Sequence, residues 1–173
     1  MKSLPLTTFY AGIDVLLEAS APGAFHNSGE RFDPPKCHPE TRTHILSKLM
    51  KWIVGEVGWD EFIMWLYGPA GAGKSAIAQT IAELCYARHL LLASFFFSRT
   101  DPKRNNEKCL IASIAYQIAL NLPEARNAIE AAVDRNPRGT RKDGYNKAGM
   151  RDVLKAERQT RSMNIGAFLE QKL

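Results

Sequence analysis

The sequence feature that most constrains the fold is a glycine-rich segment near the middle of the chain: Gly68, Pro69, Ala70, Gly71, Ala72, Gly73, Lys74 and Ser75. It matches the phosphate-loop pattern G-x-x-x-x-G-K-[ST] at every specified position. Six apolar or aromatic residues, 62–67, precede it, and such a run is typical of a strand buried on both faces. Behind it, apolar residues recur at helical spacing. The chain is therefore predicted to pass from a buried strand, through this loop, into a helix.

The chemistry of such a loop follows from its backbone. Glycines 68, 71 and 73 allow unusual dihedral angles and a close approach to a ligand. The curled amides form an anion-binding nest, and the N-terminus of the helix adds the positive end of its dipole. Lys74 is placed to reach the β- and γ-phosphates, and the Ser75 hydroxyl to bind Mg²⁺. We therefore predict that residues 68–75 bind ATP or GTP with Mg²⁺; the alternative is a glycine-rich turn that binds no ligand.

The hydrophobic pattern predicts further helices and a second buried strand. A weak helical pattern at 4–20 is followed by a loop rich in Pro, Gly and Asn at 21–39. An amphipathic helix is predicted within 39–57, before the first strand. The remaining predicted elements are a strand at about 90–97, helices within 108–122 and 123–136, and a helix at about 148–160.

The basic charge of the chain lies at its C-terminal end. The net charge is +5, but residues 135–173 carry ten Lys or Arg against four Asp or Glu. This end has only two aromatic residues, Tyr145 and Phe168, so it lacks a platform on which bases could stack. The distribution favours a solvated tail and disfavours nucleic acid as a partner. A membrane span is not predicted, because the chain contains no run of 18 apolar residues.

The cysteines and histidines show no metal-binding or disulfide pattern. Cys37, Cys85 and Cys109 are odd in number and have no CxxC spacing, which indicates free thiols in a reducing compartment. We expect Cys85 and Cys109 to lie on apolar helix faces. The histidines, which we expect to be solvated or at helix ends, are His26, His38, His44 and His89.

Four blocks of the sequence together resemble one family. They are "CHPETRTHILSKLMKWI", "FIMWLYGPAGAGKSAIAQTIAE", "ASFFFSR" and "LIASIAYQIA", and they lie in family order between about residues 24 and 136. They resemble the NACHT-type (STAND) signalling NTPases, in the subgroup whose domain is called nephrocystin-3-like N-terminal. The helix containing Thr41 and Arg42 and the strand "SFFFSR" make the resemblance specific, since many unrelated proteins share the phosphate loop.

The resemblance implies a nucleotide-dependent switch in a cytoplasmic signalling protein. The implied fold is the three-layer α/β/α arrangement of P-loop NTPases. Nucleotide exchange in such proteins moves them between a closed monomer and an open oligomer, so the family's oligomerisation surfaces imply protein partners. Thr41 and Arg42 fall in a segment that usually lies near the nucleotide base.

The chain departs from the family pattern in its acidic residues. Family members carry an aliphatic strand that ends in Asp, which holds Mg²⁺, with a neighbouring acid that orients water. Asp101 follows a strand but falls in a Pro-containing turn, and Glu170 ends the near-apolar run "NIGAFLE" close to the last residue. Neither fits, so no catalytic residue is predicted and hydrolysis is doubtful. The chain resembles a family member truncated before its Walker B strand, with an incomplete parallel sheet.

These observations divide the chain into three parts. We expect an N-terminal helix and loop at 1–38, a partial NACHT/P-loop domain at 39–136, and a basic, poorly ordered tail at 137–173. The predicted function is nucleotide binding; the alternatives are a non-catalytic interaction remnant and a small P-loop kinase. Since the later strands of the family fold are expected to be missing, the strand "LLLASFFFS" is predicted to be exposed and to aggregate when the chain is alone.

Overall fold

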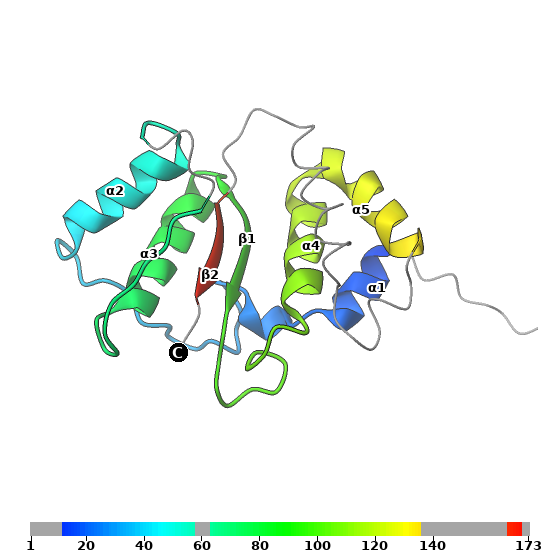
Figure 1. Cartoon of the computed structure of the whole chain (residues 1–173), viewed down its shortest axis with the longest axis horizontal. Coiled ribbons are helices and arrows are strands. Elements are labelled where there is room, and N and C mark those ends of the chain that lie inside the picture. Colours follow the sequence, from blue (N-terminus) through cyan, green and yellow to red (C-terminus); the bar gives the residue numbers. More distant parts are fainter. Residues whose placement is uncertain (1–11, 58–62, 136–165, 171–173) are drawn as a thin grey trace, which may run out of the picture.

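The computed structural model describes residues 12–57, 63–135 and 166–170 (Figure 1). Its helices are α1 (Gly12–Ala19), the short 3-10 helix η1 (Pro22–Ala24), α2 (Thr43–Ile53), α3 (Lys74–Ala87), α4 (Leu110–Asn121) and α5 (Pro123–Arg135), and its strands are β1 (Leu91–Phe96) and β2 (Gly166–Glu170). The predicted helices around the phosphate loop are confirmed, as is the predicted strand at 90–97. The helix predicted at 148–160 lies outside the described residues.

The strands β1 and β2 pair in parallel, with helices on both sides. The register runs from Leu91 opposite Gly166 to Phe96 opposite Glu170. α2 and α3 lie on one side of the strands, and α1, α4 and α5 on the other (Figure 1). All six side chains of β1 are buried, as expected for a parallel strand whose two faces are both covered. The sequence predicted that the strand at 90–97, which is β1, has no partner from later in the chain. This prediction is wrong, because β2 lies near the C-terminus and pairs with one edge of β1.

The other edge of β1 is covered by side-chain amides of α4. Successive residues of a strand direct their backbone groups to opposite edges, so Leu92 and Ser94, two residues apart, face the same edge. The Ser94 N–H donates to Gln117 Oε1 (3.1 Å), and Gln117 Nε2 donates to the Ser94 carbonyl (2.9 Å). Asn121 Nδ2 donates to the Leu92 carbonyl (2.8 Å). Since an open strand edge invites pairing with another chain, these two amides protect β1 as a neighbouring strand would.

Two of the three hydrophobic clusters in the described residues fill the space between β1 and the helices, and the third joins Phe95 to Ala21 and Ala24. The first packs α2 and α3 against β1, and its buried members are Leu49, Met50, Ile53, Ile77, Ala78, Ile81, Ala82, Cys85, Leu91 and Phe96. The second packs α1, α4 and α5 against β1, and its buried members are Leu16, Leu92, Ala93, Ala112, Ala115, Ile118, Ala119, Ala125, Ile129 and Val133. β1 contributes to both clusters, so it joins the two helical layers into one body. Cys85 is free, and burial raises the pKa of its thiol to about 11.

The segment before the phosphate loop differs from its prediction. Residues 63–67 run extended but form no strand in the described part of the chain. Ile63, Trp65 and Tyr67 are 81%, 66% and 84% exposed, whereas Met64 and Leu66 pack against the cluster of α2 and α3. The prediction of a strand buried on both faces is therefore wrong here, because core residues cover one face of the segment and leave the other to solvent. The prediction that the strand at 90–97 is exposed is wrong, since β1 is buried, whereas three apolar side chains of residues 63–67 are exposed.

The loop after η1 is fastened to β1 and α3 by a buried polar network. The His26 N–H donates to Ser94 Oγ (2.9 Å), and Gln79 Nε2 donates to the His26 carbonyl (3.0 Å). Arg31 Nη1 donates to Gln79 Oε1 (2.7 Å), and its guanidinium lies 3.7 Å from the ring centroid of Phe96. His26 is 8% exposed, so the expectation that it is solvated or at a helix end is wrong. The network holds residues 26–31 against the second half of β1.

Acidification is expected to weaken this attachment through His26. Burial lowers the pKa of His26, the charge of Glu83 raises it, and the charge of Arg31 lowers it further. The net effect is a lowered pKa for His26 in the folded chain. As the pH falls through the unfolded-state value of about 6.5, the unfolded chain binds more protons than the folded chain, so the free energy of unfolding decreases as the pH decreases. The slope contributed by one proton is at most about 1.4 kcal/mol per pH unit.

Urea unfolding at pH 7.5 and at pH 5.5 measures this effect. The wild type is expected to lose more stability over this interval than His26→Gln, in which the titrating group is absent. His44→Gln, at an exposed position of α2, is the matched control and should follow the wild type. Equal losses in all three chains would show that His26 does not titrate in the unfolding equilibrium.

Candidate nucleotide-binding site

The phosphate loop joins the extended segment 63–67 to the first turn of α3. A turn closes from Pro69 to Ala72, where the Ala72 N–H donates to the Pro69 carbonyl (3.2 Å). Gly71 and Gly73 have φ angles of 79° and 83°, which residues other than glycine rarely adopt. Gly73 is the N-cap of α3, and its carbonyl accepts the first helical hydrogen bond from the Ile77 N–H (3.0 Å). The loop therefore has the left-handed turns that a curled, anion-binding backbone needs.

Lys74 lies across the opening of the loop. Its Nζ donates to the carbonyls of Gly68 (2.8 Å) and Pro69 (3.0 Å). The ammonium group is thus held by the first two residues of the motif while its backbone begins α3. Ser75, the second residue of α3, is partly buried. The N–H groups of a first helical turn have no partner within the helix, so this end of α3 offers donors as well as positive charge.

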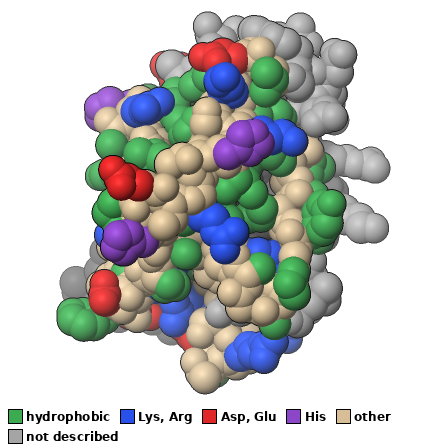
Figure 2. All heavy atoms as spheres, turned by 90° about the vertical axis from the view of Figure 1, so that its left-hand side faces the viewer, with side chains coloured by type: hydrophobic (Ala, Val, Ile, Leu, Met, Phe, Trp, Pro, Cys, Tyr) green, Lys and Arg blue, Asp and Glu red, His purple; other side chains and the backbone are tan. Residues whose placement is uncertain are grey.

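The position of the loop in the fold suits a ligand site. α3 begins at the end of the molecule where β1 and β2 finish, so the loop lies beside the carboxyl ends of the parallel strands (Figure 1). Ligands of open α/β sheets bind at these carboxyl ends of the strands. Figure 2 shows the side of the molecule that carries α2 and the loop: basic side chains lie near the centre of this face and also at its top and bottom, and acidic ones lie toward its margins.

A contact from Arg42 to the loop was not anticipated. Arg42 Nη2 donates to the Ala72 carbonyl at 3.3 Å, so the residue before α2 touches the backbone of the loop. The family resemblance placed Thr41 and Arg42 near a base, whereas here Arg42 lies against the loop. Thr41 stabilises the turn before α2 through a hydrogen bond from its Oγ1 to the His38 carbonyl (2.6 Å). The neighbouring "TR" pair in the sequence was the available signal for this contact.

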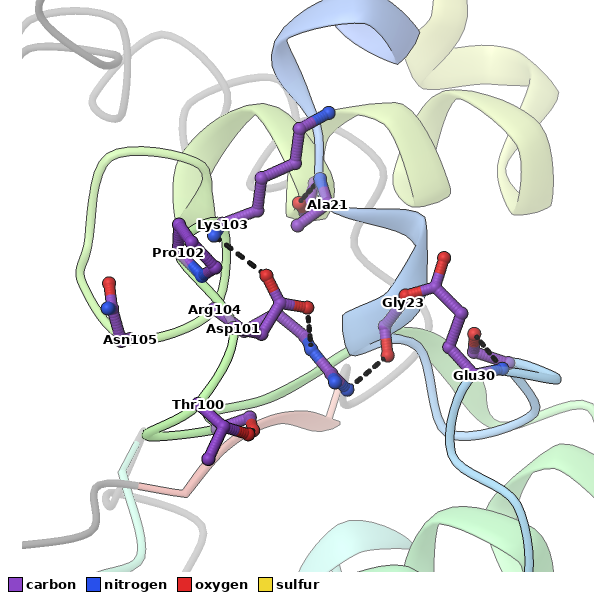
Figure 3. Close-up of polar contacts among 12 residues, drawn as sticks. Ala21, Gly23, Glu30, Thr100, Asp101, Pro102, Lys103, Arg104 and Asn105 are labelled. Carbon is purple, nitrogen blue, oxygen red and sulfur yellow. Dashed lines mark hydrogen bonds and ion pairs between the residues drawn. The ribbon is translucent and has the colours of Figure 1, made fainter.

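Asp101 is occupied by a structural role. Its Oδ1 accepts from the Lys103 N–H (2.8 Å), and its Oδ2 pairs with Arg104 Nε at 2.6 Å (Figure 3). The Lys103 N–H and then the Arg104 guanidinium hold the pKa of the Asp101 carboxyl below its usual value. Arg104 also donates to the Gly23 carbonyl (2.7 Å) and so ties this loop to η1. The prediction that Asp101 belongs to a turn beyond the strand is confirmed, and its carboxylate is committed to folding that turn.

Glu170 ends β2. The register places its backbone opposite Phe96, at the carboxyl edge of the two strands. Of the two acids considered from the sequence, Glu170 lies within a strand, and its backbone is at the carboxyl end of that strand, where the loop also lies.

The comparison with family models identifies the family of this chain. The chain belongs to the family described as "Nephrocystin 3, N-terminal", whose model matches residues 41–165. The match begins at Thr41 and includes α2, the phosphate loop, α3, β1, α4 and α5. No curated protein and no solved structure matches the chain significantly. In the part of the chain that the structure describes, there is no helix long and apolar enough to cross a membrane.

Proposed function

We propose that this chain binds a nucleoside triphosphate, ATP or GTP, with Mg²⁺ through residues 68–75. The observation that carries the proposal is the loop itself: left-handed glycines at 71 and 73 lead directly into α3, and the ammonium of Lys74 lies across the opening. Lys74 would contact the β- and γ-phosphates, and the Ser75 hydroxyl would bind Mg²⁺. The chain's membership of the nephrocystin 3 N-terminal family, whose model covers the loop, supports this proposal.

The broader proposal is a NACHT-type switch. Helices on both sides of parallel strands support a three-layer α/β/α fold of the P-loop type, with the loop at its carboxyl edge. In this proposal nucleotide binding changes the affinity for protein partners, in the cytoplasm. Hydrolysis is not part of the proposal, because the carboxylate of Asp101 is engaged by Lys103 and Arg104.

Substitution of Lys74 tests the proposal. Lys74→Ala is expected to weaken the binding of a fluorescent Mg²⁺-nucleotide at least tenfold, about 1.4 kcal/mol, because it removes the ammonium group aimed at the terminal phosphates. Lys51→Ala, at an exposed lysine in the last turn of α2, is the control and should bind as the wild type does.

The titration also separates the alternatives. Equal binding curves for the wild type and Lys74→Ala would refute the site. A wild type that shows no saturable binding would favour an interaction protein that does not use nucleotide. Transfer of the γ-phosphate to a small acceptor would instead favour the P-loop kinase.

A further inference from the structure

The contact between Arg42 and the phosphate loop joins two segments that are distant in the sequence. Arg42 has a φ of 58°, a left-handed conformation that a non-glycine residue adopts at an energetic cost. This conformation directs the chain into α2 while the side chain reaches the Ala72 carbonyl (3.3 Å). A Cβ placed on Gly73 would lie 3.9 Å from the same Nη2 atom. The guanidinium therefore lies beside the peptide bond that joins Ala72 to Gly73.

The geometry of that peptide bond gives the contact a consequence. In a planar trans peptide, the carbonyl of one residue and the N–H of the next point in opposite directions. A guanidinium that holds the Ala72 carbonyl on one side therefore fixes the Gly73 N–H on the other side. Gly73 is also the N-cap of α3, so its N–H belongs to the group of donors that the helix leaves without an internal partner.

We propose that Arg42 is a positioning residue for the phosphate site. By holding the Ala72 carbonyl, it orients the Gly73 N–H as a donor to a bound phosphate, and it couples the start of α2 to occupancy of the loop. The inference rests on the proposed function and extends it to a residue outside the motif. It differs from a direct contact between the Arg42 charge and the phosphate, which would require the guanidinium to leave the Ala72 carbonyl.

Three substitutions test this role by nucleotide titration. Arg42→Ala is expected to weaken Mg²⁺-nucleotide binding about fivefold, the effect of one modest hydrogen bond. Arg42→Lys keeps an N–H donor of similar reach and should retain most of the affinity, whereas Arg42→Gln is too short to reach the Ala72 carbonyl and should bind as Arg42→Ala does. A weaker Arg42→Ala chain whose Gly73 amide resonance is unchanged would show that the charge acts directly on the phosphate and would overturn the positioning role.

The amide resonance of Gly73 provides a readout in the unliganded chain. Arg42→Ala is expected to shift the Gly73 amide more than that of Gly55, which lies at the other end of α2. An unmoved Gly73 amide together with wild-type affinity would overturn the inference. If the wild type binds no nucleotide, the proposed function fails and the phosphate part of the inference fails with it. The chemical shift of the Gly73 amide then still shows whether Arg42 orients the peptide bond between Ala72 and Gly73.

Discussion

Replacement of Gln117 by leucine is expected to lower the free energy of unfolding by about 2–6 kcal/mol. The Gln117 amide accepts from the Ser94 N–H and donates to the Ser94 carbonyl, and Ser94 is 1% exposed. Leucine fits a similar volume but can neither accept nor donate. It would leave two buried backbone groups of β1 unpaired, and each such group costs about 1–3 kcal/mol. The expected loss is large because water cannot replace the amide at this edge.

Urea denaturation followed by circular dichroism measures this loss. Asn127→Leu is a matched control, since it makes the same kind of change at an exposed position of the neighbouring helix α5. Exposed substitutions usually change stability by about 0.5 kcal/mol or less. Equal unfolding midpoints for Gln117→Leu and Asn127→Leu would contradict the role assigned to Gln117. Increased self-association of the Gln117→Leu chain would agree with an opened strand edge.

The helices were predictable because their signals are local. The apolar positions of α2, α3 and α4 recur at helical spacing, and α5 begins at Pro123, which suits the first turn of a helix. The role of Gln117 was not predicted, although a glutamine within the apolar run "LIASIAYQIALN" was a visible signal. A polar residue on an apolar face needs a partner, but the sequence does not say which backbone provides it.

The strands were less predictable, because their burial depends on distant parts of the chain. Residues 62–67 and 91–96 are similar in composition, yet β1 is covered on both faces and residues 63–67 on one. The difference arises from what packs on them. β2 was seen in the sequence only as an apolar run ending in Glu170, and its pairing with β1 joins segments far apart in the chain. A short apolar run does not specify its partner.

The candidate site was predicted in its motif but not in its surroundings. The left-handed glycines and the start of α3 at Lys74 follow from the phosphate-loop pattern. The contact from Arg42 depends on how α2 packs on α3, which the motif does not encode. His26 was missed for the same reason, since its burial comes from Ser94 and Gln79 in other elements. Nucleotide binding and the division into parts at residues 38 and 136 stay predictions.

The conformation of the loop can be tested separately from its chemistry. Gly71→Ala is expected to weaken nucleotide binding about tenfold, while Gly29→Ala leaves it unchanged. An added Cβ meets no atom within 4 Å at either position, so neither substitution creates a clash. Only Gly71 has a positive φ, at 79°, where a side chain costs about 1–2 kcal/mol. The pair therefore isolates the dihedral angle as the cause.

The weaker binding is expected because the strain relaxes in the unliganded loop. If the Gly71→Ala loop relaxes to a negative φ, the amides turn away from the phosphate; if it instead keeps its shape, the chain is destabilised by that amount and the affinity is unchanged. A relaxed loop must return to the left-handed conformation when nucleotide binds, and about 1.4 kcal/mol of such cost corresponds to a tenfold weaker affinity. Titration with fluorescent Mg²⁺-nucleotide and thermal melting of the unliganded chains distinguish the two outcomes. Affinity and melting temperature that both match Gly29→Ala would show that nucleotide binding does not require the left-handed turn at Gly71.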